Sequence, residues 1–466
     1  MIREYFAKRG FTLPCADWYK QIGNYLDWYE GDVASFHKYS VFNGTAMVRV
    51  KRYALGMAKV IAEDHANLLL NEKVKITAEQ GFDETLQALL AANNFRVQGN
   101  NLVELAFALG TGAFVEYING DGSPTIDYIR ADMIYPLSYD NGTITECAFA
   151  SVKTCDGVKA FYLQIHRLIC GKYTIENVYL DAENGKKLPL PEGIRDIVQT
   201  GSPVPLFQIV RPNIVNNYDL DNPMGMSVYG NAIDQLKGCD LIWDSYMNEF
   251  TLGRKRIMVP LSMAKIEMSK AGETTPLFDP NDTTFYVYQQ DTDGKNELKE
   301  VNMSIRAEQH ELGLQRVLNL LSKKCGLGND RYRFDGGGGI KTATEVISEK
   351  SELFQNLKKN ELLLESALIG LVKALAFLSG RQPDIEVHVA FDDSIIEDHT
   401  ARIDDHIKLT GAGLESKLAA IMDIKKCSEA DAQKELKRIN DENMMNATPD
   451  DLYPPHGGDA NDNTTG

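Results

Sequence analysis

The 466-residue sequence lacks long hydrophobic runs: none approaches the roughly 18 apolar residues that a membrane-spanning helix needs. Residues 1–6 also lack the apolar core of a secretory signal, so we expect neither a signal peptide nor a membrane partner. Seven cysteines are scattered without any CxxC spacing. That distribution argues against a disulfide framework or a zinc ribbon and favours a reducing compartment.

Positive charge is in short supply. The chain has 49 Lys and Arg against 66 Asp and Glu, for a net charge of −17. An acidic protein repels nucleic acid as a whole, which argues against a conventional DNA-binding module. Solubility alone accounts for most acidic surfaces. The alternative is a surface along which DNA passes without adhering, and charge by itself does not choose between the two.

A nucleotide-binding motif is also missing. A Walker A loop needs Gly-Lys-Ser/Thr in direct succession, whereas Ile340 separates the four glycines 336–339 from the next two polar residues. Two interpretations of this stretch stay open: a flexible loop that contacts DNA phosphate beside a helix start, or a plain connector capped by a threonine. The candidate DNA-contacting residues are Gly336, Gly337, Gly338, Gly339, Lys341 and Thr342.

The sequence shows no catalytic constellation. His37, His65 and His166 have no second ligand at metal spacing, which favours surface or core positions over zinc. The paired carboxylates at 392–393 and 404–405 have no companion His, Lys or glycine motif. We therefore expect a protein that is not an enzyme and that has no metal and no cofactor.

The N-terminal and middle parts predict helices followed by strands. Residues 1–45 read as short helices and turns with aromatic anchors, and apolar spacing predicts helices over 49–70, 83–92 and 101–110. Alternating segments separated by Asn-Gly and Asp-Gly turns then predict one antiparallel sheet. Its expected strands are 113–118, 124–129, 144–154, 159–169 and 172–180.

The third part predicts two helices joined by a small β insert. After the turn-rich residues 216–227 comes a helix of roughly 25 residues, in which Asp240 interrupts a near-heptad apolar stripe; the returning helix is 306–325. The residues expected to pack these helices are Tyr229, Ile233, Leu236, Trp243, Met247, Phe250, Leu314, Leu318 and Leu321. Arg254, Lys255 and Arg256 form a basic cluster that complements the dipole at the end of the first helix and could also contact nucleic acid or a partner.

The C-terminal part is mainly helical. We expect a long helix over 342–378, a strand over 385–391, and helices over 392–410, 414–422 and 428–440. From residue 441 the tail has six acidic residues and no Lys or Arg, which is typical of disorder.

Several of these stretches resemble one known family. They are Asn216–Ser227 with the following Tyr229-Gly230 and Ile233, then Gly253-Arg254-Lys255-Arg256-Ile257, and Gly339–Val346 with its KTATEV core. Together they are similar to tailed-bacteriophage portal proteins, of the family found in siphophages and prophages of Gram-positive hosts. The similarity extends from about residue 28 to residue 442.

The resemblance implies an α+β portal-protein fold with a mainly helical wing, an antiparallel β section, a two-helix stem, a small α/β clip and a short helical crown. The implied parts are an N-terminal wing (1–225), stem helix 1 (226–254), a clip (255–305), stem helix 2 (306–326), the glycine loop near the tunnel with the long wing helix (327–395), crown helices (396–445) and a disordered acidic tail (446–466).

The resemblance also implies a structural subunit of a ring, usually of twelve copies, at one vertex of the capsid. Double-stranded DNA would pass through the ring without sequence-specific contacts during packaging and ejection. The implied partners are the terminase large subunit, head-completion or adaptor proteins, and major capsid and scaffolding proteins, in the virion and in the host cytoplasm during assembly. Alternatives are a ring or adaptor protein of a headless prophage or injection-type particle, and a cytosolic enzyme of unknown type.

Overall fold

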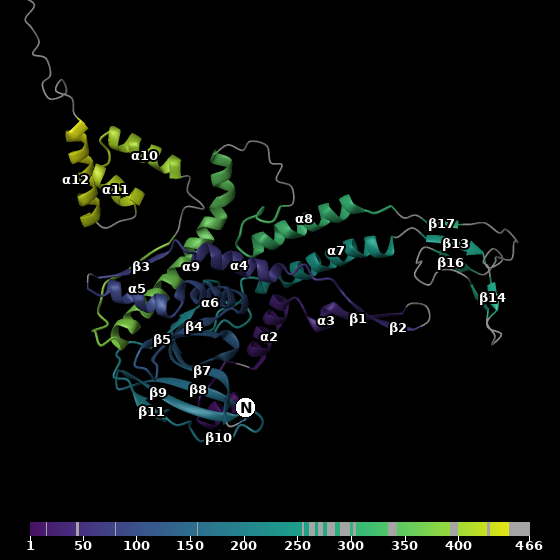
Figure 1. Cartoon of the computed structure of the whole chain (residues 1–466), viewed down its shortest axis with the longest axis horizontal. Helices are drawn as coiled ribbons and strands as arrows, with labels where there is room; N and C mark the ends of the chain where they lie inside the picture. The colour runs from purple at the N-terminus through teal and green to yellow at the C-terminus, as the bar shows by residue number, and fades with distance from the viewer. Residues whose placement is uncertain are drawn as a thin grey trace, which may run out of the picture. The chain divides into compact units, whose positions relative to one another are not determined.

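The chain forms two compact units, Met1–Phe391 and Asp392–Gly466, which are described separately (Figure 1). The structure is a computed structural model. It describes residues 1–14, 16–42, 46–79, 81–155, 157–253, 256–260, 266–268, 274–276, 285–288, 299–301, 304–333, 343–391, 399–425 and 429–446. Helices and strands are mixed through the first unit, as expected for an α+β protein.

A six-stranded antiparallel sheet forms one layer of the first unit. Its long strands β7 (Thr143–Cys155), β8 (Val158–Ile169) and β9 (Lys172–Asp181) confirm the predicted segments. The turn before β7 confirms the Asn-Gly signal, because Asn141 and Gly142 both have positive φ, of 47° and 74°. The other strands are β6 (Ile134–Asp140), β10 (Lys187–Leu188) and β11 (Ile197–Gln199).

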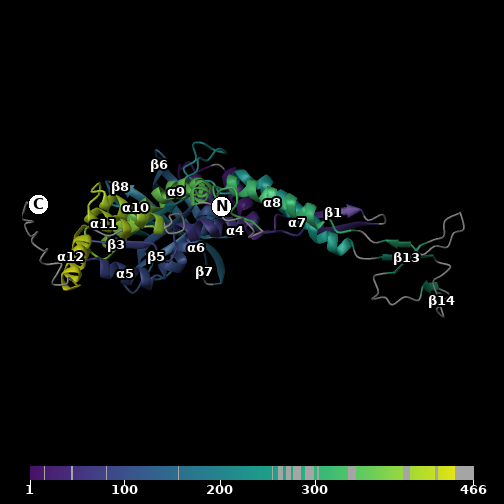
Figure 2. The same cartoon turned by 90° about the horizontal axis from the view of Figure 1, so that it is seen from above.

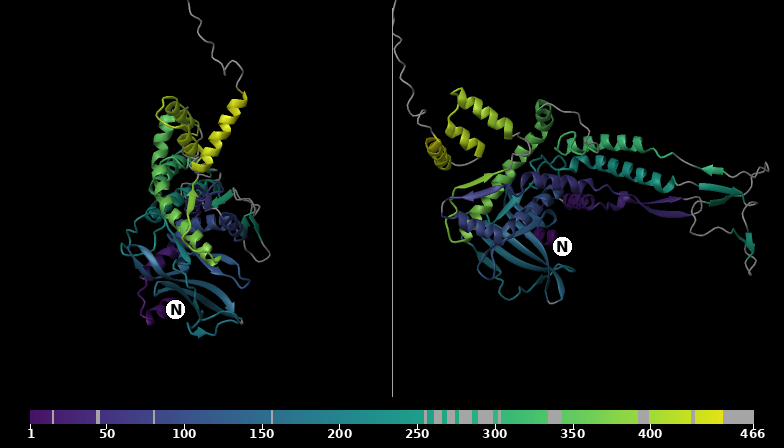
Figure 3. Two further views of the ribbon diagram at one scale, coloured as in Figure 1. Left: turned by 90° about the vertical axis from the view of Figure 1, so that its left-hand side faces the viewer. Right: turned by 45° about the horizontal axis from the view of Figure 1, so that its top comes forward.

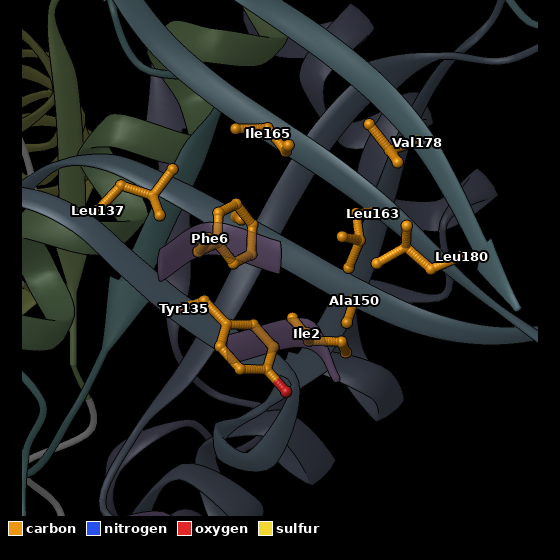
Figure 4. Packing of buried hydrophobic residues seen from close by; sticks show 10 residues of the cluster. Ile2, Phe6, Tyr135, Leu137, Ala150, Leu163, Ile165, Val178 and Leu180 are labelled. Atoms are coloured by element: carbon orange, nitrogen blue, oxygen red, sulfur yellow. The ribbon is translucent and has the colours of Figure 1, made fainter. Parts of the chain in front are cut away.

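The outer face of this sheet is covered by helix α1 (Ile2–Lys8). Ile2 and Phe6 lie among alternate residues of β6 to β9, the pattern expected where one face of a strand is buried (Figure 4). Phe6 is fully buried, with its ring centroid 6.1 Å from that of Tyr135. Burial of such side chains stabilises the layer by about 2 kcal/mol each.

A second, three-stranded sheet lies against the other face. Its order is β12-β4-β5, with β4 (Gly112–Ile118), β5 (Pro124–Arg130) and β12 (Phe207–Val210). Phe207 contacts the rings of Phe149 and His166 from the large sheet, at 5.4 and 5.5 Å. The expectation of one sheet was therefore wrong. A 3₁₀ turn at Ala131–Met133 (η1) separates β5 from β6, and the distant β12 completes the smaller sheet.

Helices α6 (Phe95–Leu109) and α9 (Ala343–Leu378) cover the remaining face of the small sheet. Leu102 and Ala106 of α6 lie close under Gly112, 3.1 and 3.0 Å from the position that a Cβ there would occupy. On α9, the absence of a side chain at Gly370 leaves room for the Gln208 amide. Helix α9 confirms the predicted long helix; α6 begins earlier than the predicted residue 101.

One of the N-terminal helices differs from the prediction in where it begins. The structure has α2 (Ala16–Glu30), α3 (Ala34–His37), α4 (Met57–Leu69) and α5 (Asp83–Ala92). The helix predicted over 49–70 begins only at Met57, because the alternating residues Met47–Lys51 form strand β2, paired with β1 (Lys38–Phe42). Gly56, with φ of +74°, begins the helix in a left-handed conformation. The helix predicted over 83–92 is confirmed.

Helix α7 (Ile233–Leu252) and helix α8 (Ala307–Lys324) flank a small β insert. The insert contains a three-stranded sheet, β13 (Arg256–Pro260), β16 (Phe285–Tyr288) and β17 (Lys299–Val301), and the pair β14 (Ile266–Met268) and β15 (Thr274–Pro276). Helix α7 is shorter than predicted. A 3₁₀ turn (η2, Gly230–Ala232) precedes it, and the Tyr229 hydroxyl donates to the Tyr25 carbonyl at 2.9 Å.

Strand β18 (Val387–Ala390) confirms the strand predicted over 385–391 and pairs with β3 (Lys75–Ala78), which the sequence patterns did not indicate. The second unit contains α10 (His399–Gly411), α11 (Lys417–Lys425) and α12 (Glu429–Asn446). His406 of α10 lies 2.7 Å from a Glu415 oxygen and 2.8 Å from an Asp423 oxygen, and these contacts raise its pKa. The first residues of the helix predicted over 392–410 and the tail beyond 446 lie outside the described residues.

The turn-rich segment 216–227 packs where α6 ends. Gly110, the residue after α6, and Gly225 approach so closely that a methyl group on either would overlap the other's carbonyl oxygen. The Thr111 hydroxyl accepts a hydrogen bond from the Gly225 N–H at 3.0 Å. This contact ties the entry of the α7 segment to the core.

We expect Gly225→Ala to lower the free energy of unfolding by roughly 2–4 kcal/mol, because the backbone on both sides must move apart. Chemical denaturation measures the change. Gly23→Ala is the control: Gly23 lies inside α2 with no atom near a new Cβ, so alanine should be neutral or stabilising. Equal stability of both variants would contradict the close packing.

Glu116 of β4 is fully buried, and both carboxyl oxygens lack a hydrogen-bond partner. An interaction with the Gln208 amide opposes the effect of burial on the pKa of Glu116 but is the smaller influence. Burial raises the pKa of Glu116 well above 4.5, so the group folds in its neutral form. Its favourable contribution is complete below about pH 4.5 and is lost as pH rises toward the folded-state pKa.

Glu116→Gln keeps the shape and removes this titration. We expect the stability of this variant relative to the native chain to increase steadily as pH rises above 4.5. Unfolding curves at several pH values test this, with the exposed Glu192→Gln as the control that leaves the pH profile unchanged. A pH-independent difference for Glu116→Gln would show that the carboxyl is charged in the folded state.

Candidate functional site: the helix pair and its anchor

Helices α7 and α8 run antiparallel and in close contact (Figure 2). The contacts lie in order along the pair: Gly238 faces Val317, Ile242 faces Gly313, the Ser245 hydroxyl and a His310 ring nitrogen are 3.0 Å apart, and Glu249 pairs with Arg306. A glycine on each helix at the contact lets the two backbones approach closely. Leu314, Leu318 and Leu321 of α8 are buried, and their part in packing the two helices stays a prediction.

The other side of α7 carries two buried carboxylates. Asp240 accepts hydrogen bonds from the Leu55 N–H at 2.7 Å and from His37 Nε2 at 3.0 Å. One turn further on, Asp244 accepts a bond from the Tyr53 N–H at 3.0 Å, with Arg52 at 3.8 Å. We call these groups the α7 anchor. They attach the segment leading out of β2 to one side of the helix.

The geometry assigns the proton on His37. The Val33 N–H donates to Nδ1 at 2.8 Å, so Nδ1 has no hydrogen and Nε2 donates to Asp240. Burial raises the pKa of Asp240, and the bonds from Leu55 and His37 oppose that shift. Because a buried carboxylate is costly unless its oxygens accept hydrogen bonds, the anchor depends on all of these donors.

Helix geometry places the anchor opposite α8. At roughly 100° per residue, Asp240 and Asp244 project from the side of α7 away from Gly238, Ser245 and Glu249. The β1–β2 hairpin, which we call the arm (residues 38–42 and 46–51), lies on the anchor side. Arm, α7 and α8 therefore form a row with α7 in the middle (Figures 1 and 3).

The predicted packing residues on α7 also lie on the anchor side. Leu236 is buried, Ile233, Trp243 and Met247 are half-buried, and Phe250 is exposed in the single chain. Tyr229 is buried before the helix begins. The α8 side of α7 carries Gly238, Ile242, Ser245 and Tyr246, which contact Val317, Gly313 and His310.

The remaining predicted residues fall elsewhere. Arg256 begins β13 and is paired in register with Val301 of β17. Arg254, Lys255, Gly336, Gly337, Gly338, Gly339, Lys341 and Thr342 lie outside the described residues. Their proposed contacts with DNA stay predictions.

His37, Arg52 and Asp244 were not predicted as functional residues. One signal was available: Asp240 and Asp244 are four residues apart, so they share one side of a helix whose neighbouring positions are apolar. Paired carboxylates in such a stripe indicate buried acceptors. Their donors lie 203, 185 and 191 residues earlier in the sequence, so the identity of the donors depends on tertiary contacts.

Within the described ranges, no three His, Cys, Asp or Glu side chains are grouped so that they could hold a metal ion. His65 and His166 are buried, which lowers their pKa values to about 4 and about 3, so both are neutral. No described helix combines the length and the apolar character needed to cross a membrane. The features that stand out in the described residues are the buried hydrogen bonds and helix contacts that hold α7, α8 and the arm in place.

These features define the class of protein by its fold: an α+β body that carries an anchored helix pair with a β insert between the helices. A family model described as phage portal protein, SPP1 Gp6-like, matches residues 17–448. The chain therefore belongs to that family and is a portal protein of the phage head–tail connector. Members of the family are structural proteins.

Among solved structures, the chain is similar to one from the "neck of native GTA particle computed with C12 symmetry". The two share 13% identity, with 79% of this chain and 88% of that chain covered and a TM-score of 0.39. No curated protein sequence matches the chain. The family membership rests on the family model.

We expect Asp240→Asn to lower the free energy of unfolding by about 1–3 kcal/mol, because an amide cannot accept from both His37 and Leu55 at the same two atoms. Denaturant titration measures the loss. Asp234→Asn is the matched control, since Asp234 lies on α7 with its side chain 85% exposed. If both variants unfold alike, the anchor does not hold α7.

Proposed function

We propose that copies of this chain form a closed ring, of twelve subunits, through which double-stranded DNA is packaged into the capsid and later ejected. The observation that carries the proposal is the anchored helix pair in a chain of the portal family. A tunnel lining must keep its diameter while DNA moves past it. Buried hydrogen bonds on one side of α7 and close helix contacts on the other suit that requirement.

The position of the helix pair in the chain would divide each subunit of the ring into a stem, a clip, a wing and a crown. Residues 226–254 and 306–326, which include α7 and α8, would form the stem, and residues 255–305 the clip. The wing would comprise 1–225 together with 327–395, and the crown helices 396–445. The β strands of the insert, β13 to β17, support a compact clip because they pair with one another.

Charge supports a passage with few adhesive contacts. With −17 per chain, a ring of such subunits repels the phosphate backbone over most of its surface. A basic residue repeated around the ring would then supply a weak, sequence-independent contact. Lys341, next to the four glycines, is the proposed residue, with Gly336–Gly339 and Thr342 as its loop.

A connector between head and tail would bind different partner proteins through its clip and its wing. The clip, with the basic cluster Arg254–Arg256, would dock the terminase large subunit during packaging and head-completion proteins afterwards. Major capsid and scaffolding proteins would surround the wing during assembly in the host cytoplasm. None of these contacts needs a cofactor or a membrane.

Electron microscopy of the purified protein tests the ring. We expect particles of twelve-fold symmetry with an axial hole; a compact monomer or dimer would overturn the proposed function. This measurement needs no partner protein.

The tunnel contact has its own test. We expect Lys341→Ala rings to assemble normally but to retain about two- to threefold less packaged DNA near 0.15 M salt, with the difference shrinking at higher salt. DNA per purified particle measures retention. Lys186→Ala is the control, because Lys186 is an exposed residue after β9. Normal retention by Lys341→Ala would remove that residue from the tunnel.

A further inference from the structure

The three helices of the second unit bury little apolar surface. Helices α10, α11 and α12 follow one another along the chain, and α11 contacts both of its neighbours. Among the described side chains of this unit, the buried apolar ones are Ala420 and Ala432. Because two alanines contribute little to the hydrophobic effect, polar contacts between these helices matter more for their packing than they do in the first unit.

His406 links α10 to α11 through both nitrogens of its ring. Nδ1 lies 2.7 Å from an oxygen of Glu415, in the connection just before α11, and Nε2 lies 2.8 Å from an oxygen of Asp423, near the other end of α11. The imidazole is only 12% exposed. One ring thus holds α11 at both of its ends.

These two contacts need a charged ring. An ionised carboxylate only accepts hydrogen bonds, and a neutral imidazole has a single N–H to donate. Since both ring nitrogens of His406 face carboxylate oxygens, both must donate, and the ring is an imidazolium. When the ring loses one proton, the lone pair of that nitrogen faces a carboxylate oxygen, so one of the two attractions is replaced by a repulsion.

The sign of the pH dependence follows from the same contacts. The bond to Glu415, followed by the bond to Asp423, raises the pKa of His406 above its usual 6.5. A group whose pKa is raised on folding contributes its full stabilisation below the unfolded-state pKa. The link between α10 and α11 is therefore complete below pH 6.5 and is lost as the pH rises through the folded-state pKa of His406.

The link between α11 and α12 is of a different kind. The Lys425 ammonium donates to a Glu435 oxygen at 2.6 Å, and this lysine lowers the pKa of Glu435 below 4.5. The other charged side chains described on α10 and α11 include Asp404, Lys408 and Lys417. Carboxylate and ammonium groups do not titrate near neutral pH, whereas an imidazole does, so His406 is the group that responds there.

The connection between α10 and α11 has room for a rotation. Gly413 has φ of +70°, and no atom outside its chain neighbours lies within 4 Å of the position that a Cβ would occupy. Beyond it, the Ser416 hydroxyl accepts a hydrogen bond from the Ala419 N–H at 3.1 Å, which holds the first turn of α11 together. Helix α11 can therefore turn as one piece about the glycine.

We propose that His406 is a pH-sensitive switch within the second unit. While the ring is charged it holds α11 against α10; when the ring loses a proton, α11 is released from α10 and stays linked to α12 through Lys425 and Glu435. The switch lies within one chain and does not depend on the proposed ring of subunits.

Hydrogen exchange of the full chain tests the release. Dividing each measured rate by the intrinsic rate at that pH leaves only the protection due to structure. We expect the protection of peptides from α10 and α11 to fall by about fivefold between about pH 6 and about pH 9, because the His406 link is lost over that range. His406→Gln has no charge to lose and should show the lower protection at both pH values.

His388→Gln is the matched control for this experiment. His388 of β18 has a side chain that is 72% exposed, so its replacement should leave the pH response of α10 and α11 as in the native chain. Protection of the native chain that is equal at both pH values would overturn the switch. A fall of the same size in His406→Gln would also overturn it, because another group would then be responsible.

Nuclear magnetic resonance of the full chain with 15N-labelled histidine follows the ring itself. The His406 signals are those missing from His406→Gln, and we expect their titration midpoint to lie above 6.5. Glu415→Gln and Asp423→Asn should each lower the midpoint, since an amide cannot attract the charged ring as a carboxylate does. Asp404→Asn, an exposed carboxylate of α10, should lower it less than either. A native midpoint at or below 6.5, or one that neither substitution moves, would show that the carboxylates do not hold His406.

Discussion

The buried hydrogen bonds around Asp240 and Asp244 connect the N-terminal segment to helix α7, about 200 residues later in the sequence. A carboxylate inside a protein is tolerated only when donors surround it. Here the donors come from His37 and from the backbone of residues 53 and 55, so the N-terminal segment must lie along α7 for the helix to be stable. The path of the segment that follows β2 and the side of α7 left for α8 both follow from that constraint.

The body beneath the helix pair is a stack of layers. Helix α1, the large sheet, the small sheet and the helices α6 and α9 each bury one face against the next. Glycines occur where backbones meet most closely, as at Gly110 and Gly225, and a buried neutral carboxyl at Glu116 lies in the same core. Exposed apolar side chains lie on the helix pair and the arm, and also on other elements of the body, as at Val97, Leu220 and Leu362.

Much of the fold could be read from local patterns. The Asn141-Gly142 turn and the alternating strands on either side are properties of neighbouring residues, and so is the long apolar repeat of α9. Local reasoning was wrong at Met47–Lys51, where β-branched alternation outweighed the helical spacing that follows it. It was also wrong about a single sheet, because β12 is some 90 residues from its partner β4, as the register of Phe207 with Val115 shows. At the site, the sequence indicated the helix pair and its buried leucines but not the anchor.

The sequence by itself determined the class of protein: its acidic charge, its helix–insert–helix order and the motifs that place it in the portal family depend on residue identity and short spacings. The tertiary structure decided which of those elements contact one another and through which residues. Whether Asp240 interrupts a stripe or anchors a helix depends on His37 and Leu55, which reach it only after folding. The physical reason is that a local pattern specifies which face of a helix is apolar, whereas the partner of that face is chosen by long-range packing and by the need to satisfy every buried acceptor.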